Sequence, residues 1–251
     1  MATTTHVADP TATTAPTEPA HHGHPALQHH FDNMEQQREA GSIGMWTFLV
    51  TEIMFFGGLF MAYLLYRTYY PEAFVVGSNS LDIVLGTINT AVLICSSLTM
   101  ALAVFFAQTG SRMLQVMFLL LTIALGATFL VIKGVEYHHK YVEHHIPTAT
   151  MFRLDEKEIP PSVAPQERDT FARRVQMFFW IYFAMTGLHA LHMIIGIGGL
   201  LVLIFFALRG RYTPEYHAPV ELFGLYWHFV DIVWIFLFPL LYLLGRHLEG
   251  H

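Results

Sequence analysis

The chain has 251 residues, of which 54% are hydrophobic and only 13% are charged. This charged share is about half of that in ordinary water-soluble domains, which argues against a soluble enzyme. A formal net charge of −6 offers no basic field that would attract nucleic acid. The single cysteine, Cys95, rules out a disulfide framework and a cysteine-based metal site, and we expect it to be a small buried residue.

Residues 1–43 are rich in His, Thr and Pro, and no Lys or Arg precedes Arg38. Without a charged start followed by an apolar run, this segment is not a cleavable signal peptide. Its composition predicts a disordered tail.

Five apolar segments follow, each long enough to cross a bilayer, which takes about 20 residues. We place the helices at about 44–66, 83–107, 113–136, 177–208 and 222–245. The predicted fold class is therefore all-α, a polytopic membrane helix bundle with five transmembrane helices in one membrane domain, 44–245. We expect a polar loop at 138–174 and a C-terminal tail at 246–251. No internal repeat supports an inverted-repeat transporter.

Each predicted helix carries its few polar residues three or four positions apart, so that they share one face. Polar groups are costly inside a bilayer, and these faces are expected to point into the bundle. The five stripes are Phe48, Glu52, Phe55 and Leu59; Asn89, Leu93, Ser96 and Met100; Gly126, Phe129, Lys133 and Glu136; His189, His192, Gly196 and Gly199; and Gly224, His228, Asp231 and Ile235.

Three roles are open to the polar residues in these stripes. The first is a metal or haem site built from His189, His192, His228 and Asp231. The second is a proton or ion path in which Glu52 is the carrier and His189, His192 and Asp231 are relays. The third is packing, in which buried polar side chains hydrogen-bond across helices, and we favour it for the three histidines and Asp231. Glu52 remains a functional candidate, because a carboxylate at that depth is either protonated or paired.

Two groups of histidines lie outside the predicted spans. They are His21, His22, His24, His29 and His30 in the tail, and His138, His139, His144 and His145 after the third helix. Such tracts can bind Zn or Cu, but a solvated tail and an interfacial helix end account for them as well. We predict no metal site in this chain.

The last helix carries the most specific motif in the sequence, Gly224-Leu-Tyr-Trp-His-Phe-Val-Asp-Ile-Val-Trp-Ile-Phe-Leu-Phe238. It strongly resembles the final helix of subunit III of haem-copper oxidases. The segment Thr186-Gly-Leu-His-Ala-Leu-His-Met-Ile-Ile-Gly196 is similar to the penultimate helix of that family. Phe48-Leu-Val-Thr-Glu-Ile-Met-Phe-Phe-Gly57 is similar to the helix that holds an intramembrane carboxylate. Shorter matches on the intervening helices are Asn89-Thr90, Ser96-Ser97, Met100, Leu125-Gly126 and Glu136-Tyr137.

The resemblance spans about 44–245, without the first two helices of the family's seven-helix form. It implies a non-catalytic subunit III of a cytochrome c oxidase of the aa3 or caa3 type, which stabilises subunit I and supports proton uptake during oxygen reduction. In that family haem and copper belong to the partner subunits I and II, so we expect no cofactor in this chain except a bound phospholipid. The implied location is a bacterial plasma membrane, with the N-terminus in the cytoplasm.

The family's residue roles transfer to matching positions of this chain. The proton-related intramembrane carboxylate is Glu52, and no catalytic residue is implied. The helix-packing polar set is Asn89, Glu136, His189, His192, His228 and Asp231. Subunit III of a quinol oxidase, or an accessory protein of nitric oxide reductase, is the alternative, because no motif here identifies the electron donor.

Three features leave questions that the resemblance does not answer. Lys133 stands where the family leads us to expect a neutral residue, and pairing with Glu136 three positions later would neutralise it. The loop 138–174 is longer than expected, and we predict that it meets another subunit or a donor domain together with the tail. The full Lys and Arg count favours an outside N-terminus, whereas the short loops favour the opposite.

Overall fold

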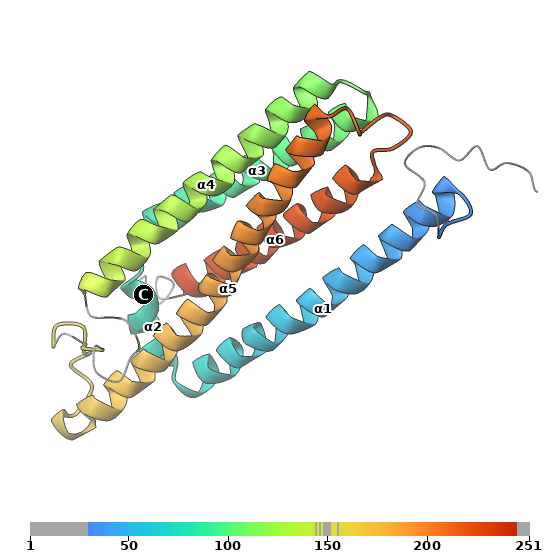
Figure 1. The fold of residues 1–251 in the computed structure, drawn as a ribbon. Coiled ribbons are helices and arrows are strands. Elements are labelled where there is room, and N and C mark those ends of the chain that lie inside the picture. The colour runs from blue at the N-terminus through green and yellow to red at the C-terminus, as the bar shows by residue number, and fades with distance from the viewer. Residues whose placement is uncertain (1–29, 144, 146, 148–151, 155, 245–251) are drawn as a thin grey trace, which may run out of the picture. The chain divides into compact units, whose positions relative to one another are not determined.

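The computed structural model describes residues 30–143, 145, 147, 152–154 and 156–244. The chain divides into two units, Met1–Ala40 and Gly41–His251, and the packing below is that of the second. The helices among the described residues are α1 (Met34–Tyr69), α2 (Pro71–Asn79), α3 (Ile83–Gln108), α4 (Arg112–Val142), the 3-10 helix η1 (Pro165–Glu167), α5 (Arg168–Leu208) and α6 (Ala218–Tyr242). All but α2 and η1 are long and apolar enough to cross a membrane. The predicted all-α bundle of five transmembrane helices is confirmed (Figure 1).

The first helix begins at Met34, so the predicted tail over 1–43 is too long. The backbone N–H of Gln36 donates to Asn33 Oδ1 at 2.8 Å, and Gln36 Oε1 accepts from the N–H of Asp32 at 2.8 Å. These reciprocal bonds resemble a capping box, which satisfies backbone donors at a helix start. The rest of the predicted tail, 1–29, and the predicted C-terminal tail, 246–251, lie outside the described residues.

The polar loop is shorter than the predicted 138–174, because both of its ends continue helices. The helix α4 runs to Val142, where Lys140 is buried and donates to the carbonyl oxygen of Ser80 at 2.6 Å. The helix α5 already begins at Arg168, and its Phe171 is also buried. Residues at both of these helix ends, Lys140 and Phe171, therefore have tertiary contacts that hydropathy alone does not reveal.

The short helix α2 was not predicted, and it lies at the C-terminal end of α6. The Ser78 hydroxyl donates to the carbonyl oxygen of Leu241 at 2.7 Å, and the Tyr63 hydroxyl on α1 donates to that of Leu240 at 2.5 Å. The last four carbonyls of a helix have no partner within the helix. Side chains of α1 and α2 thus satisfy two of these carbonyls at the end of α6.

Two glycines with positive φ end helices at the hairpins. Gly110, with φ 76°, follows α3, and Gly210, with φ 71°, follows α5. In each case the glycine N–H bonds to the carbonyl three residues back, that of Ala107 or Ala207. Glycine adopts this left-handed conformation without steric cost, which makes it the usual helix terminator. The hairpins α3–α4 and α5–α6 are set by the same local device.

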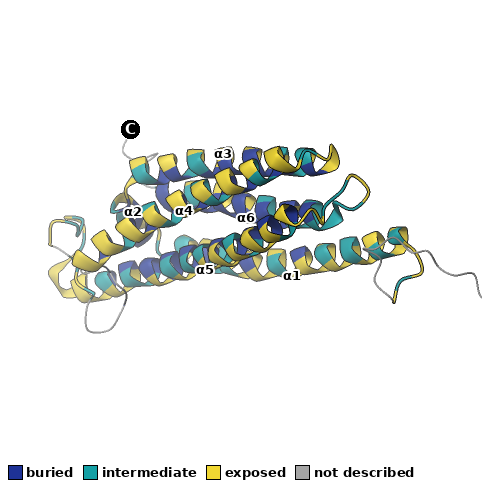
Figure 2. Cartoon of the chain, turned by 45° about the horizontal axis from the view of Figure 1, so that its top comes forward, coloured by how far each residue is buried: buried dark blue, intermediate teal, exposed yellow. Residues whose placement is uncertain are grey.

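Helices α3 to α6 enclose the core, and buried residues line their inward faces (Figure 2). The largest fully buried side chains include Trp227, Trp234 and Tyr182. The predicted stripes on α3 and α4 are buried throughout, from Asn89 to Met100 and from Gly126 to Glu136. Their spacing correctly identified the inward face.

The stripe predicted for α1 is displaced, and the expectation for Cys95 was wrong. The buried residues of α1 are Leu49, Phe56 and Tyr63, whereas Phe48 and Phe55 are 39% and 48% exposed. Because α1 meets its neighbours along one narrow strip, apolar residues on its other faces have the same sequence signature as the buried ones. Cys95 on α3 is likewise exposed, because an apolar run alone does not show which of its residues face the bundle.

Candidate functional site

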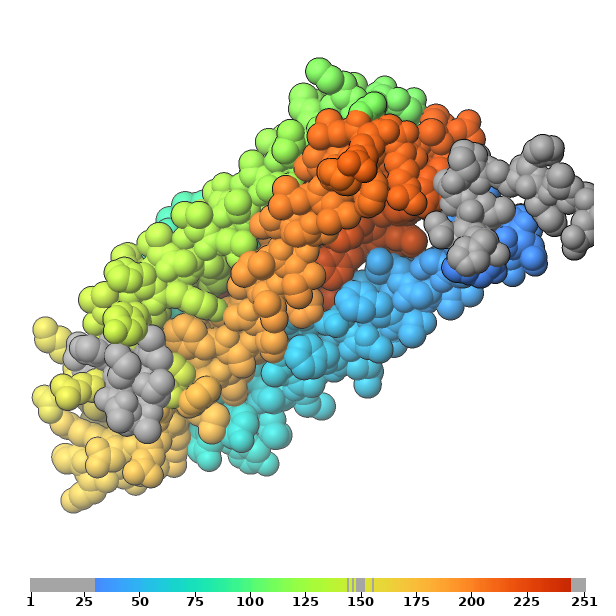
Figure 3. Space-filling model, viewed as in Figure 1, coloured from blue at the N-terminus to red at the C-terminus, as the bar shows by residue number. Residues whose placement is uncertain are grey.

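The carboxylate of Glu52 on α1 meets the imidazole of His192 on α5. Glu52 Oε2 lies 3.0 Å from His192 Nε2, and the two side chains are only 18% and 13% exposed. This contact joins two residues that the sequence assigned to different roles, a proton-related group and a packing group. The two helices that carry the pair, α1 in light blue and α5 in orange, lie side by side in the space-filling view (Figure 3).

The other ring nitrogen of His192 determines how many protons the pair holds. Nδ1 lies 2.8 Å from the carbonyl oxygen of Leu188, which can only accept, so Nδ1 carries a hydrogen. An ionised Glu52 facing an unprotonated Nε2 would place two acceptors in contact. One further proton therefore lies between Nε2 and Glu52, and the pair is neutral whichever group holds it. A proton can shift across this bond without leaving a net charge in the bilayer.

Aromatic groups hold His192 in place. The ring of Phe56 lies 5.3 Å from the imidazole, and the Tyr226 hydroxyl donates to the His192 carbonyl oxygen at 2.9 Å. The buried Phe56 comes from α1 and Tyr226 from α6, so both helices contact this residue of α5, and the contact of Nδ1 with Leu188 orients the ring. Such a fixed ring keeps Nε2 directed at the carboxylate.

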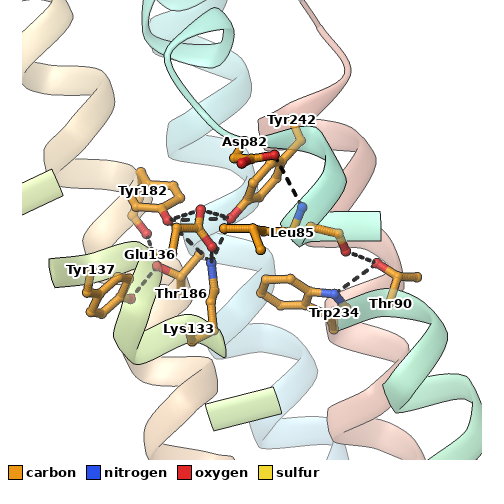
Figure 4. A network of polar contacts seen from close by, with 11 residues as sticks. Asp82, Leu85, Thr90, Lys133, Glu136, Tyr137, Tyr182, Thr186, Trp234 and Tyr242 are labelled. Carbon is orange, nitrogen blue, oxygen red and sulfur yellow. Dashed lines mark hydrogen bonds and ion pairs between the residues drawn. The ribbon is translucent and has the colours of Figure 1, made fainter. Parts of the chain in front are cut away.

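A second polar cluster lies deeper, where Lys133 and Glu136 of α4 meet two tyrosines (Figure 4). Lys133 Nζ lies 3.0 Å from Glu136 Oε2, and both side chains are 3% exposed. The predicted pairing of these residues is confirmed. Lys133 Nζ also donates to the hydroxyls of Tyr182 on α5 and Tyr242 on α6, at 3.3 and 2.7 Å.

The cluster is saturated by its own members. The hydroxyls of Tyr182 and Tyr242 both donate to Glu136 Oε1, at 2.8 and 2.5 Å. Lys133 Nζ also lies 4.8 Å from the centre of the Trp234 ring. This cation–π contact stabilises the cation further. One ion pair and its hydrogen bonds thereby connect α4, α5 and α6.

The other predicted packing residues fall into two groups. Cross-helix hydrogen bonds form at Glu136, at His192 and at His228, whose Nδ1 lies 2.7 Å from Ser97 Oγ. No hydrogen-bond partner among the described residues meets the buried side chains of Asn89, His189 and Asp231. The cross-helix hydrogen bonds that the sequence predicts for these three side chains are not formed among the described residues.

His189 lies among aromatic rings. Its ring centroid is 5.3 Å from that of Phe129 and 5.1 Å from that of Trp234. Within the described ranges, no three His, Cys, Asp or Glu side chains converge in a group that could hold a metal ion. His189, His192, His228 and Asp231 therefore do not form such a group.

Two hydrogen bonds between α3 and α6 were not predicted from the sequence. Trp227 Nε1 donates to Ser96 Oγ at 3.0 Å, and Trp234 Nε1 donates to Thr90 Oγ1 at 3.1 Å. Both indoles belong to α6 and both hydroxyls to α3. A buried indole needs an acceptor, and a hydroxyl at a matching depth on another predicted helix was a signal available in the sequence.

Outside the membrane-spanning helices, charged groups fasten the segment that follows α4. Glu143 Oε2 accepts from Lys140 Nζ at 2.5 Å and lies 3.4 Å from His145 Nδ1. His145 Nε2 lies 3.2 Å from Glu158, and the imidazole stacks on Phe179 of α5 at 5.0 Å. Partial burial raises the pKa of Glu143, but the hydrogen bonds and charges of Lys140 and His145 outweigh it and hold the pKa below its usual 4.5.

This lowered pKa predicts an acid-sensitive attachment. A carboxyl whose pKa is depressed by folding stabilises the folded form above its unfolded pKa, and the contribution disappears as pH falls through the folded value. We expect the protection of backbone amides in 156–167, measured relative to their intrinsic exchange rate at each pH, to fall below about pH 4.5. In Glu143→Gln, exchange there should be faster at neutral pH and should lose this pH dependence. Identical pH profiles for the two proteins would contradict the assignment.

Comparisons with known proteins find similarity to oxidase subunits. The family described as cytochrome c oxidase subunit III matches residues 168–246. Cytochrome c oxidase subunit 3 of Thermostichus vulcanus is 31% identical, over 86% of this chain and 92% of its own length. The protein of the same name from Synechocystis sp. is 31% identical, over 97% of this chain and 88% of its own. A probable quinol oxidase subunit 3 of Staphylococcus haemolyticus is 28% identical, over 87% and 96%.

Proposed function

Because the chain belongs to the cytochrome c oxidase subunit III family, we propose that it is the non-catalytic subunit III of a haem-copper terminal oxidase that accepts electrons from cytochrome c. The chain is a multi-pass membrane protein of an oxidase complex. The similarity to cytochrome c oxidase subunits over nearly their whole length carries the choice of donor. A quinol oxidase is the second candidate, favoured by the similarity to the protein of S. haemolyticus.

In this proposal haem and copper reside in subunits I and II, and this chain stabilises subunit I and supports proton uptake. The Glu52–His192 pair supports the second role, because the geometry of Nδ1 and Nε2 allows one proton to be shared between the imidazole and the carboxylate. Neutrality of the pair keeps the free energy of either proton position low in a medium of low dielectric constant.

We also propose that the N-terminus is cytoplasmic and that the membrane is the bacterial plasma membrane. The two hairpins on the N-terminal side carry Arg112, Arg209 and Arg211. Short cytoplasmic loops are enriched in Lys and Arg, and the charge of these hairpins therefore supports this orientation.

A bound phospholipid, the one small molecule expected for this chain, has a suitable groove. A cavity of about 460 Å³ lies between α1 and α6. Its lining is apolar, with Phe56, Phe60, Phe229 and Phe236 among its residues. An acyl chain is the occupant that such a surface favours in a bilayer.

A mild-detergent purification of the tagged chain tests the proposal. Oxidase subunits should co-purify, and the haem absorbance should leave with them when the chain is separated. A dinuclear-copper motif in the co-purified subunit II would identify cytochrome c as the donor, and its absence would identify quinol. A haem that stays with the isolated chain, or the lack of any haem protein in the purified complex, would overturn the proposal.

Glu52→Gln tests the proton role. Glutamine keeps a hydrogen bond to His192 but has no exchangeable charge state, so the complex should assemble normally. We expect several-fold faster loss of activity over repeated turnovers. The control is Thr51→Val, since the Thr51 hydroxyl bonds only locally, to the carbonyl oxygen of Phe48. Turnover that endures equally in Glu52→Gln and in the unaltered complex would count against proton transfer by this pair.

A further inference from the structure

A pocket of about 370 Å³ opens between α3 and α6 on the outside of the bundle. Most of its lining is apolar, including Ile94, Leu98 and Ile235, which are 54%, 62% and 45% exposed. Three polar residues also line it: Ser97, His228 and Asp231. An apolar surface with polar groups inside a pocket is unlike one that faces only lipid tails.

Asp231 is the unusual member of this set. It is only 3% exposed, and neither carboxylate oxygen has a hydrogen-bond partner among the described residues. The hydroxyl of Ser97 is near enough to act on the carboxyl, but it is bonded to His228 Nδ1 at 2.7 Å. A carboxyl group has two oxygens, so at least one of them needs a donor from elsewhere. Buried polar groups in native proteins are nearly always hydrogen-bonded.

The depth of Asp231 restricts where that donor originates. The residue lies near the middle of the 25-residue helix α6, roughly 16–20 Å from either helix end at a rise of 1.5 Å per residue. In a bilayer whose hydrocarbon core is about 30 Å thick, headgroups lie about 15 Å from the middle, and acyl chains have no donor. The donor must therefore belong to a neighbouring protein helix or be an isolated water.

We propose that this pocket, defined by Ser97, His228 and Asp231, receives an amide or hydroxyl side chain from a transmembrane helix of a partner subunit, with Asp231 as the acceptor. The inference rests on the proposed function, which supplies membrane partners, and it adds the surface through which one of them binds. Polar side chains commonly hydrogen-bond across helices inside membranes. The exposed isoleucines and leucine around the pocket provide the apolar contact on either side.

The inference separates Asp231 from two other buried groups without partners. Asn89 and His189 are fully buried at 0% exposure, and they do not line this pocket. A partner helix cannot reach them without opening the bundle. Asp231 is the member of this group, unpartnered among the described residues, that lines the pocket.

Site-specific photocrosslinking in the intact complex tests the position of the partner. A benzoyl-phenylalanine introduced at Ile94, on the rim of the pocket, should crosslink to the transmembrane segment of an oxidase subunit, next to an Asn, Gln, Ser or Thr. The same group at Ile194 of α5, equally exposed at 56%, is the matched control and should give no such product. Adducts of Ile94 with lipid alone would overturn the inference.

Substitutions then test the acceptor. Asp231→Asn keeps a carbonyl oxygen and should retain the partner, whereas Asp231→Leu should reduce the amount of partner recovered per chain by about tenfold. Equal recovery in Asp231→Leu would contradict the inference and would indicate a bound water as the donor. If Asp231→Leu does not fold, the crosslink in the protein with native Asp231 still decides.

The failure of this inference can be told from failure of the proposed function. Co-purification of haem subunits by the unaltered chain supports the function whatever the pocket does. Such a complex without an Ile94 crosslink to protein would remove only the pocket assignment. A chain that co-purifies with no oxidase subunit would remove both.

Discussion

Replacement of Lys133 by Met should destabilise the protein by about 3–5 kcal/mol, the cost of leaving one charge of a buried pair without its partner. Glu136 would keep the hydroxyls of Tyr182 and Tyr242 as donors but would lose the cation 3.0 Å away. Because the cluster joins α4, α5 and α6, the loss should appear as a lower midpoint of thermal unfolding in detergent. It should also lower the yield of folded protein.

The double variant Lys133→Met, Glu136→Gln should recover most of this stability, since it removes both charges together. Apolar or neutral replacements of a whole buried pair are often tolerated. The matched control is Arg168→Met, which breaks an ion pair with Glu156 whose side chains are 45% and 88% exposed. That change should cost about 1 kcal/mol or less. A double variant no more stable than Lys133→Met would contradict the interpretation of the cluster as one neutral unit.

Gly77→Ala should be the second large effect, through a collision rather than a lost charge. A Cβ atom at Gly77 would lie 2.3–2.8 Å from ring atoms of Phe178. Phe178 is 0% exposed and packs against Phe74 at a ring distance of 5.4 Å, so its ring cannot move aside. Overpacking of this kind costs typically about 1–3 kcal/mol. The unfolding midpoint measured in detergent would report it.

Gly58→Ala is the control for this prediction. No atom lies within 4 Å of a Cβ built at Gly58 on α1, and alanine favours a helix over glycine by about 1 kcal/mol. We expect this variant to be as stable as the unaltered chain or slightly more stable. Equal losses in both variants would show that backbone conformation, and not the contact of α2 with α5, governs the response at Gly77.

Length and hydropathy predicted the five membrane helices, because an apolar run long enough to cross a bilayer has few alternative structures. The spacing of three residues predicted the Lys133–Glu136 pair for an equally local reason. Neither signal reaches Tyr182 and Tyr242, which lie 49 and 109 residues beyond Lys133. These partners depend on how the helices pack, which periodicity does not encode.

The candidate site shows the same division. Glu52 was recognisable as an intramembrane carboxylate, but its contact with His192 spans 140 residues. The inward face predicted for α1 was displaced because α1 carries apolar residues on every face. The nine-residue α2 was missed because so short a helix gives no clear periodicity. Conversely, the unpartnered Asp231 becomes visible only once its surroundings are known.

The capping of α6 by Tyr63 and Ser78 has a consequence for biogenesis. The hydroxyl donors are made early in translation, whereas their acceptors, the carbonyls of Leu240 and Leu241, emerge near the end of synthesis. Until α6 enters the bilayer, the first transmembrane helix lacks its attachment to the last. Completion of the chain is thus coupled to closure of the bundle, and a product truncated before Leu240 lacks the two hydrogen bonds that join the end of α6 to α1 and α2.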